Sequence, residues 1–252
     1  MLNSNPPTPH SPLCIPHSIG TKHESSLHRD LKFAYTGEGG QTEAEFAGFV
    51  ADGISSQGEF IEVQTGSFGP LRKKVLQFAE KGRVRIVYPI AMAKYIEVYN
   101  AEGKRQYRRK SPRKGSPWDI FNALVYAPEL PLVSGLTIEL ALLDMVETRY
   151  QDGKGSWRRK GVSIGDRRIA VSHERICLAA PSDYLRFVPF EGDDEFTSSA
   201  LGEKAGIPAD LARKALYVLT RIGVVHRIAR KRNSYIYKVV LIGKNRTRKK
   251  KR

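Results

Sequence analysis

The side chains in this sequence best placed for chemistry are two acids, Asp52 and Glu62. Asp52 ends one predicted strand and Glu62 lies in the next, within the run Glu62-Val63-Gln64. Residues two apart on a strand share a face, so Glu62 and Gln64 should project together while Val63 points into the core. A hairpin with a short turn would bring the two carboxylates together, where both cannot stay ionised cheaply without a cation between them. A divalent ion such as Mg²⁺ binds such oxygen ligands, keeps several waters and activates one against a phosphodiester.

Each acid also has a purely structural interpretation. Asp52 could simply open a turn with Gly53. Glu62 is harder to explain in that way, because a carboxylate beside Ile61 in a strand expected to be central is costly unless it is paired or bound to a metal. We therefore favour a functional role for the group Asp52, Glu62 and Gln64.

A first helix is expected to begin near Thr21 and to carry Glu24, His28 and Lys32 in one row, because these residues are each four apart. His28 could contact phosphate or act as an acid or base near neutral pH. Glu24 has an alternative role as the partner of Thr21 in a capping box. His28 and Lys32 could equally form a solvated flank of the helix.

A second helix is expected to open at Gly69-Pro70 and to end at Gly82. Lys74 borders its apolar stripe, whereas Lys73 points away from it. Lys74 is therefore the basic side chain that we expect beside the acids. The stripe itself consists of Leu71, Val75, Phe78 and Ala79.

The elements around these residues indicate a mixed sheet. Residues 43–54 are expected to form one extended strand, followed by strands over 59–66 and 83–90. Strand, helix and strand over some thirty residues form a crossover unit, which requires a parallel strand pair. Further along we expect a basic loop over 104–115, a helix over 118–130, a strand or helix over 135–150, a basic loop over 152–161 and then a strand.

The last segment has the layout of a winged helix-turn-helix. A short helix Ser198–Ala205, a turn, a helix over 209–223 and two strands within 224–242 follow in that order, and the strands enclose a basic turn. We therefore expect four regions: a disordered tail over 1–20, an α/β domain with basic loops over 21–190, the winged helix over 191–243 and a basic tail over 244–252.

The order of motifs from about Glu24 to Ile90 resembles that of the PD-(D/E)xK, or restriction-endonuclease-like, nuclease superfamily. Asp52 followed by Glu62-Val63-Gln64 is similar to its D…(D/E)xK signature, with Gln in place of Lys, and the helix–strands–helix–strand order is that of its core. The chain also resembles an uncharacterised bacterial family with E-x-S-L-H-x-x-L-K, then D, then I-E-x-Q-T, then a basic helix. The resemblance implies an α/β fold with a restriction-endonuclease-like mixed sheet core flanked by helices.

The resemblance also implies roles for individual residues. Asp52 and Glu62 would bind Mg²⁺ or Mn²⁺, and Glu24 would complete the metal shell as helix glutamates of the superfamily often do. The superfamily lysine positions or activates water, whereas the Gln64 amide can orient water but supplies no charge. Some restriction enzymes carry Gln at this position, and Lys74 offers a replacement for the charge.

The overall charge indicates a polyanionic partner. Lys and Arg number 42 against 26 Asp and Glu, a formal charge of +16, and release of counterions from phosphates rewards each basic contact. We expect DNA, with RNA possible, and no membrane, because no apolar run approaches the roughly 20 residues that a spanning helix needs. The first residues lack the pattern of a secretory signal, and Cys14 and Cys177 are expected to be free thiols. A cytoplasmic, nucleoid-associated location follows as an expectation.

Basic residues in two loops and in the C-terminal segment are the candidate DNA contacts. Trp157, within the second loop, could pack against the domain or stack on a base. In the winged helix, Arg213 and Lys214 would face the groove, and the wing tip would meet phosphate or the minor groove. The candidates are Arg108, Arg109, Lys110, Arg113, Lys114, Arg158, Arg159, Lys160, Arg213, Lys214, Arg230, Lys231 and Arg232.

These observations favour a metal-dependent DNA endonuclease or a related DNA-processing nuclease, with a homodimer possible. Two rival interpretations remain open. One is a nuclease fold that binds DNA but, with Gln64, no longer cuts it, and the other is an RNA-directed nuclease. A zinc centre, a nucleotide-binding P-loop and a Ser/His/Asp arrangement are not apparent in the sequence.

Overall fold

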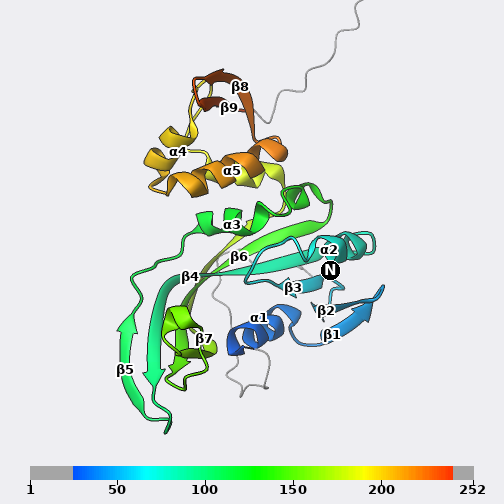
Figure 1. Ribbon diagram of the computed structural model, residues 1–252. Coiled ribbons are helices and arrows are strands. Elements are labelled where there is room, and N and C mark those ends of the chain that lie inside the picture. The colour runs from blue at the N-terminus through cyan, green and yellow to red at the C-terminus, as the bar shows by residue number, and fades with distance from the viewer. Residues whose placement is uncertain (1–24, 241–252) are drawn as a thin grey trace, which may run out of the picture.

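The computed structural model describes residues 25–240 and shows a mixed α/β architecture (Figure 1). A seven-stranded sheet has the order β1-β2-β3-β4-β6-β7, and β5 pairs with β4 outside this path. Helices pack against both faces of the sheet, as expected from the sequence. The elements of this part are α1 (Ser26–Thr36), β1 (Gln41–Phe46), β2 (Phe49–Ile54), β3 (Phe60–Val63), α2 (Arg72–Ala79), β4 (Val84–Tyr99), β5 (Arg105–Lys110), α3 (Ile120–Leu124), β6 (Leu136–Tyr150) and β7 (Ser163–Leu178).

The predicted crossover is confirmed. Strands β3 and β4 pair in parallel, with Glu62 opposite Ile86, and α2 connects them. Strands β4 and β6 are also parallel, whereas the β1–β2, β2–β3, β4–β5 and β6–β7 pairs are antiparallel. The parallel strands lie in the middle of the sheet, where both faces can be covered.

The single strand expected over 43–54 is wrong, because the chain turns back in the middle of it. Strands β1 and β2 form a hairpin closed at Phe46 and Phe49. Its two turn residues, Ala47 and Gly48, have φ angles of 51° and 76°. Positive φ at both turn positions matches the right-handed twist of the flanking strands. Alanine is an unusual residue for that conformation, so no clear turn signal marks this position.

The strand expected over 83–90 continues to Tyr99, and the loop expected over 104–115 contains strand β5. All six residues of β5 are exposed, so the basic composition that suggests a loop belongs to a solvated edge strand. Residues 136–150 form a strand, which resolves the ambiguity between strand and helix. The helix expected over 118–130 is limited to Ile120–Leu124, with 3-10 turns on both sides.

Helix α1 begins at Ser26 rather than near Thr21. Ser25 is the N-cap, and its side-chain oxygen accepts a hydrogen bond from the backbone N–H of His28 at 3.3 Å. This satisfies one of the free amides at the start of the helix. The proposed capping box of Thr21 and Glu24 lies outside the described residues, as do the two predicted tails.

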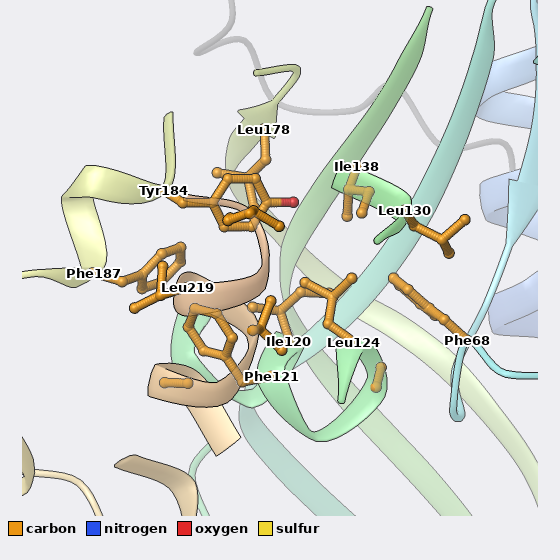
Figure 2. Packing of buried hydrophobic residues seen from close by; sticks show 14 of the residues in the cluster. Phe68, Ile120, Phe121, Leu124, Leu130, Ile138, Leu178, Tyr184, Phe187 and Leu219 are labelled. Atoms are coloured by element: carbon orange, nitrogen blue, oxygen red, sulfur yellow. The ribbon is translucent and has the colours of Figure 1, made fainter. Parts of the chain in front are cut away.

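Two hydrophobic clusters cover the two faces of the sheet. The smaller cluster joins Leu27 and Leu31 of α1 to Ile61, Val63 and neighbouring strands. The larger one joins the helices of the opposite face to strands β3, β4 and β6. Figure 2 shows part of the larger cluster, with aromatic and aliphatic side chains from several elements packed closely. Val63 is 4% exposed, which confirms that it points into the core.

The C-terminal segment has the expected order of two helices and a hairpin. These are α4 (Ser198–Ala205), α5 (Ala209–Arg221), β8 (Val225–Lys231) and β9 (Ser234–Val239), and an isolated bridge joins Phe196 to Tyr237. Leu219 of α5 lies in the same cluster as Phe121 and Phe187 (Figure 2). The segment is therefore packed on the α3 side of the sheet through a continuous apolar contact. Among residues 25–240, no helix is long and apolar enough to cross a membrane.

Close packing of α1 against the hairpin gives a stability prediction. A Cβ atom built at Gly53 would lie 2.1 Å from the Oγ1 atom of Thr36, so Gly53→Ala must displace the end of α1. We expect the variant to lose about 1–3 kcal/mol in the free energy of unfolding, measured by urea denaturation. Gly66→Ala is the matched control, because a Cβ there meets no atom within 4 Å. An unchanged midpoint for Gly53→Ala would contradict this packing.

Candidate active site

The two predicted acids lie where strands β2 and β3 diverge. Paired residues end at Gly53 and Ile61, so Asp52 and Glu62 occupy the next opposed positions. Each side chain there replaces a lost strand contact. The Asp52 Oδ2 atom accepts from the backbone N–H of Val63 at 2.8 Å, and the Glu62 Oε1 atom accepts from the backbone N–H of Asp52 at 3.2 Å. The two carboxylates are thus brought together by the fork of the sheet.

The two carboxylates have opposite electrostatic tendencies. Burial and, after it, the neighbouring charge of Asp52 together raise the pKa of Glu62 to about 7, although Lys74 opposes the shift. Burial also acts to raise the pKa of Asp52, but hydrogen bonds from His28 and Val63 outweigh it and hold that pKa below its usual value. Glu62 is 2% exposed. The pair therefore consists of one firmly ionised acid and one acid that titrates near neutral pH.

Lys74 supplies the positive charge beside Glu62. Its Nζ atom lies 2.6 Å from Oε1 and 2.7 Å from Oε2 of Glu62. Helix α2 presents it from the opposite side of the sheet to α1, since Val75 and Phe78 are buried in the larger cluster. Lys73 is exposed. The expected difference between the two lysines agrees with their places in the structure.

His28 reaches the site from α1. Its Nε2 atom lies 3.2 Å from the Oδ2 atom of Asp52, so the imidazole and the Val63 amide share one carboxylate oxygen. Lys32, on the same row of α1, instead pairs with Glu43 of β1 at 3.1 Å. Glu24 lies outside the described residues.

Gln64 lies directly after the end of β3. The hydrogen bonds that its side chain makes in the structure do not join it to the acids. Its side-chain amide donates to the backbone oxygen of Ser67 at 2.9 Å, and its backbone N–H donates to Val87 at 2.9 Å. The amide therefore shapes the turn that leads towards α2.

The donor set suits a small, hard cation. The two acids are near enough for the charge of Asp52 to act on Glu62, and a lysine pairs with the buried acid. Mg²⁺ commonly binds through one or two carboxylates together with waters and substrate phosphates. Within residues 25–240, no group of three or more His, Cys, Asp or Glu side chains is arranged to hold a metal ion. A cation bound here would have Asp52 and Glu62 as its carboxylate ligands and would leave most coordination positions to water and substrate.

The predicted nucleic-acid contacts are exposed, except for one packed position. Lys214 is half-buried, and its Nζ atom donates to Asn122 of α3 at 3.0 Å and pairs with Asp210 at 2.7 Å. Its amine is therefore engaged within the protein, because α5 packs on α3. The exposed residues are Arg108, Arg109 and Lys110 on β5, Arg113 and Lys114 after it, Arg158, Arg159 and Lys160 between β6 and β7, Arg213 on α5, and Arg230, Lys231 and Arg232 at the β8–β9 turn.

Sequence reasoning missed three buried glutamates with basic neighbours. Glu147 contacts Lys94, Arg149 and Arg167. Arginines also surround Glu97 and Glu139, and a hollow of about 400 Å³ lies beside the latter. Acidic residues inside long, mainly apolar strands were the available signal, because a buried charge requires a partner.

These features define a class: an α/β protein whose mixed sheet forks around two acids and one lysine. The chain belongs to the family described as "Domain of unknown function (DUF8091)", whose model matches residues 25–179. It is also 30% identical over 152 residues to an "Uncharacterized protein" of Treponema pallidum (strain Nichols). That match covers 60% of this chain and 61% of the relative, so the chain spans about three fifths of that protein's length. No solved structure matches the chain.

The family match runs from α1 to β7. It includes His28, Asp52, Glu62 and Lys74, and it ends before the C-terminal helices and hairpin. The candidate site is thus contained in the family domain, whereas α4, α5, β8 and β9 follow it.

Proposed function

We propose that this protein is a metal-dependent DNA nuclease that hydrolyses phosphodiester bonds at the fork between β2 and β3. The observation that carries the proposal is the convergence of Asp52 and Glu62, with the Lys74 amine 2.6 Å from the buried acid. The sheet order, the β3–α2–β4 crossover and α1 across the opposite face support a restriction-endonuclease-like core.

Each side chain has a separate part in this proposal. Asp52 and Glu62 would hold Mg²⁺ or Mn²⁺, which when bound supplies a Lewis acid and an activated water. Lys74 would position the attacking water and balance charge that develops on the phosphate, which is the part of the lysine in the D…(D/E)xK signature. His28 would orient Asp52 and contact the scissile phosphate.

The surrounding basic surfaces would position DNA. The C-terminal helices and hairpin support a winged-helix module whose β8–β9 turn presents Arg230, Lys231 and Arg232. Because Lys214 is engaged by α3, the wing and Arg213 would make more of the contacts than the rest of α5. Such an activity would act in the cytoplasm, in association with the nucleoid.

A plasmid-nicking assay tests the proposal. Purified protein should convert supercoiled plasmid to open circles with Mg²⁺ or Mn²⁺, and EDTA should stop the reaction. Binding of plasmid without any cleavage under both metals would instead favour a non-catalytic DNA-binding protein. Preferential cleavage of RNA of equal length in a competition assay would redirect the proposal to an RNA nuclease.

Lys74 provides a specific prediction for this site. Lys74→Met should lower the cleavage rate about 100-fold, because it removes the only lysine paired with Glu62 in the described structure and, with it, the group proposed to position water. The exposed neighbour gives a matched control: Lys73→Met should cleave at the wild-type rate. Initial nicking rates at saturating metal measure both. Equal rates for the two variants would remove Lys74 from the mechanism.

A further inference from the structure

The far ends of strands β4 to β7 carry a second feature, which we name the aromatic tip. It consists of the β4–β5 turn and the loop between β6 and β7, together with the strand ends beside them. The two connections lie at the same end of the sheet (Figure 1), and the backbone N–H of Gln151 donates to Tyr99 at 2.9 Å. Its exposed side chains are Lys104, Arg105, Tyr107, Tyr150, Lys154, Trp157, Arg158, Arg159 and Lys160.

Trp157 is displayed to solvent. It is 83% exposed, and the guanidinium of Arg158 lies 5.4 Å from its ring centroid. Packing against the domain, which the sequence left open for this residue, is therefore excluded. Tyr107 and Tyr150 are also exposed, at 47% and 38%. Exposed aromatic rings gathered at one end of a sheet and rimmed by basic side chains are typical of an interaction surface.

The loop that carries Trp157 has a defined shape. The backbone N–H of Gly155 donates to Gly161 at 2.8 Å, and the Asp152 carboxylate accepts from the hydroxyl of Ser163 at 2.8 Å. A Cβ at position 155 would lie 1.9 Å from the backbone oxygen of Val162, so the two sides of the loop are in close contact. The backbone that carries the ring is thus ordered before any ligand arrives, which reduces the entropy lost on binding.

Basic groups continue from the tip towards the candidate active site. Tyr150 lies about 10 Å along β6 from Glu147. Glu147 forms ion pairs with Arg149, Arg167 and Lys94. A groove of about 170 Å³ is lined by Lys94, Glu147 and Arg167, and it also contacts Leu27 and Thr65. These last two residues are the sequence neighbours of His28 and Gln64. Lys94 and Arg167 therefore line a groove between the strands that lead to the tip and the chain neighbours of His28 and Gln64.

We propose that the aromatic tip binds single-stranded DNA, by stacking bases on Trp157 and the tyrosines while the basic side chains contact the phosphates. The proposal rests on the proposed nuclease function only for the cleavage of the bound strand; the binding itself does not depend on it. Rings can stack on the open faces of unpaired bases, whereas the bases of a duplex are already stacked on each other. The substrate class is thus DNA with a single-stranded segment.

The test measures binding of full-length protein to a labelled oligothymidylate of about 20 nucleotides, in EDTA, by fluorescence anisotropy. Trp157→Ala should weaken binding about 5-fold or more, the effect of one lost base–aromatic stack. Trp157→Phe should restore most of the affinity. Tyr126→Ala, which removes a 65% exposed ring outside the tip, should bind as wild type.

Two further measurements separate stacking from charge. The oligonucleotide should quench tryptophan emission in wild type and not in Trp157→Phe. Replacing Arg158, Arg159 and Lys160 by alanine should reduce the slope of log affinity against log salt by about 2. Affinity for a duplex of the same length should change less than 2-fold in Trp157→Ala, roughly the scatter of such measurements.

Several results would overturn the proposal. Unchanged oligothymidylate affinity in Trp157→Ala would do so, as would an equal loss for single strand and duplex. Binding to anionic phospholipid vesicles that depends on Trp157, with DNA binding unaffected, would assign the tip to a membrane surface instead. The binding assay contains no divalent metal, so it is independent of cleavage. Single-strand binding without plasmid cleavage would support the role of the aromatic tip and contradict only the nuclease function.

Discussion

Asp52→Asn and Glu62→Gln are each expected to lower the rate of metal-dependent cleavage by more than about 1,000-fold. Both substitutions keep the size of the side chain and an oxygen that can accept the hydrogen bonds from the Val63 and Asp52 amides. They remove one negative charge from a site whose proposed task is to hold a cation. The fork of the sheet should therefore persist while metal binding fails.

Initial nicking rates in Mg²⁺ measure this loss, and DNA affinity in EDTA measures whether the substrate still binds. Affinity should be unchanged or slightly higher, because each variant is less negative. Glu45→Gln is the matched control, since Glu45 is an exposed carboxylate on the neighbouring β1 strand, and it should cleave at the wild-type rate. Cleavage that survives both substitutions would show that the chemistry occurs elsewhere or comes from a contaminating nuclease.

The order of elements around the site could be predicted because local patterns specify it. β-Branched and aromatic residues indicated β3, apolar residues indicated the start of β4, and Gly82 marked the end of the α2 region. The separation of Lys74 from Lys73 followed from helical periodicity alone. The meeting of Asp52 with Glu62 needed only a short hairpin, whose register is fixed by its turn.

The extension of the sheet could not be predicted in this way. Strand β5 consists of exposed, mostly basic residues, so its pairing with β4 leaves no periodic pattern. The continuation of β4 past Pro89 depends on pairing with β6, which lies far along the chain. The contacts of Glu147 with Lys94 and Arg167 depend on the same non-local pairing. Tertiary context, rather than local preference, determines these strands.

Two positions on α1 show why spacing cannot assign a side chain's partner. His28 and Lys32 share a row of α1, yet only His28 reaches Asp52, while Lys32 pairs with Glu43. The difference arises because the β1–β2 hairpin, which was expected as one strand, brings Glu43 back across the helix. A turn closed by Ala47 and Gly48 thus decides which α1 residues belong to the site.

The pKa of Glu62 leads to a prediction about metal binding and pH. Burial and the charge of Asp52 raise this pKa to about 7 from its ordinary value of 4.5, whereas Asp52 stays ionised because its pKa is lowered. In the absence of metal, the native state holds a proton on Glu62 that the unfolded chain has already released. The stability that this proton contributes is complete below about pH 4.5 and is lost as the pH rises to about 7. The total is roughly 3 kcal/mol.

A divalent ion requires the ionised form, so it must compete with that proton. We expect the affinity for Mn²⁺ to fall about 10-fold for each pH unit below 7 and to level off above pH 7. The rise in melting temperature caused by Mn²⁺ should accordingly be large at pH 8. At pH 5, about 100-fold more Mn²⁺ should be needed for the same rise. Glu62→Gln, which cannot titrate, should lack both the stabilisation and its pH dependence. Lys74→Met should move the midpoint of the pH dependence of Mn²⁺ affinity to higher pH, because Lys74 opposes the rise in the pKa of Glu62. Metal affinity that stays constant between pH 5 and pH 8, or a midpoint unmoved by loss of Lys74, would mean that the bound cation is not held by Glu62.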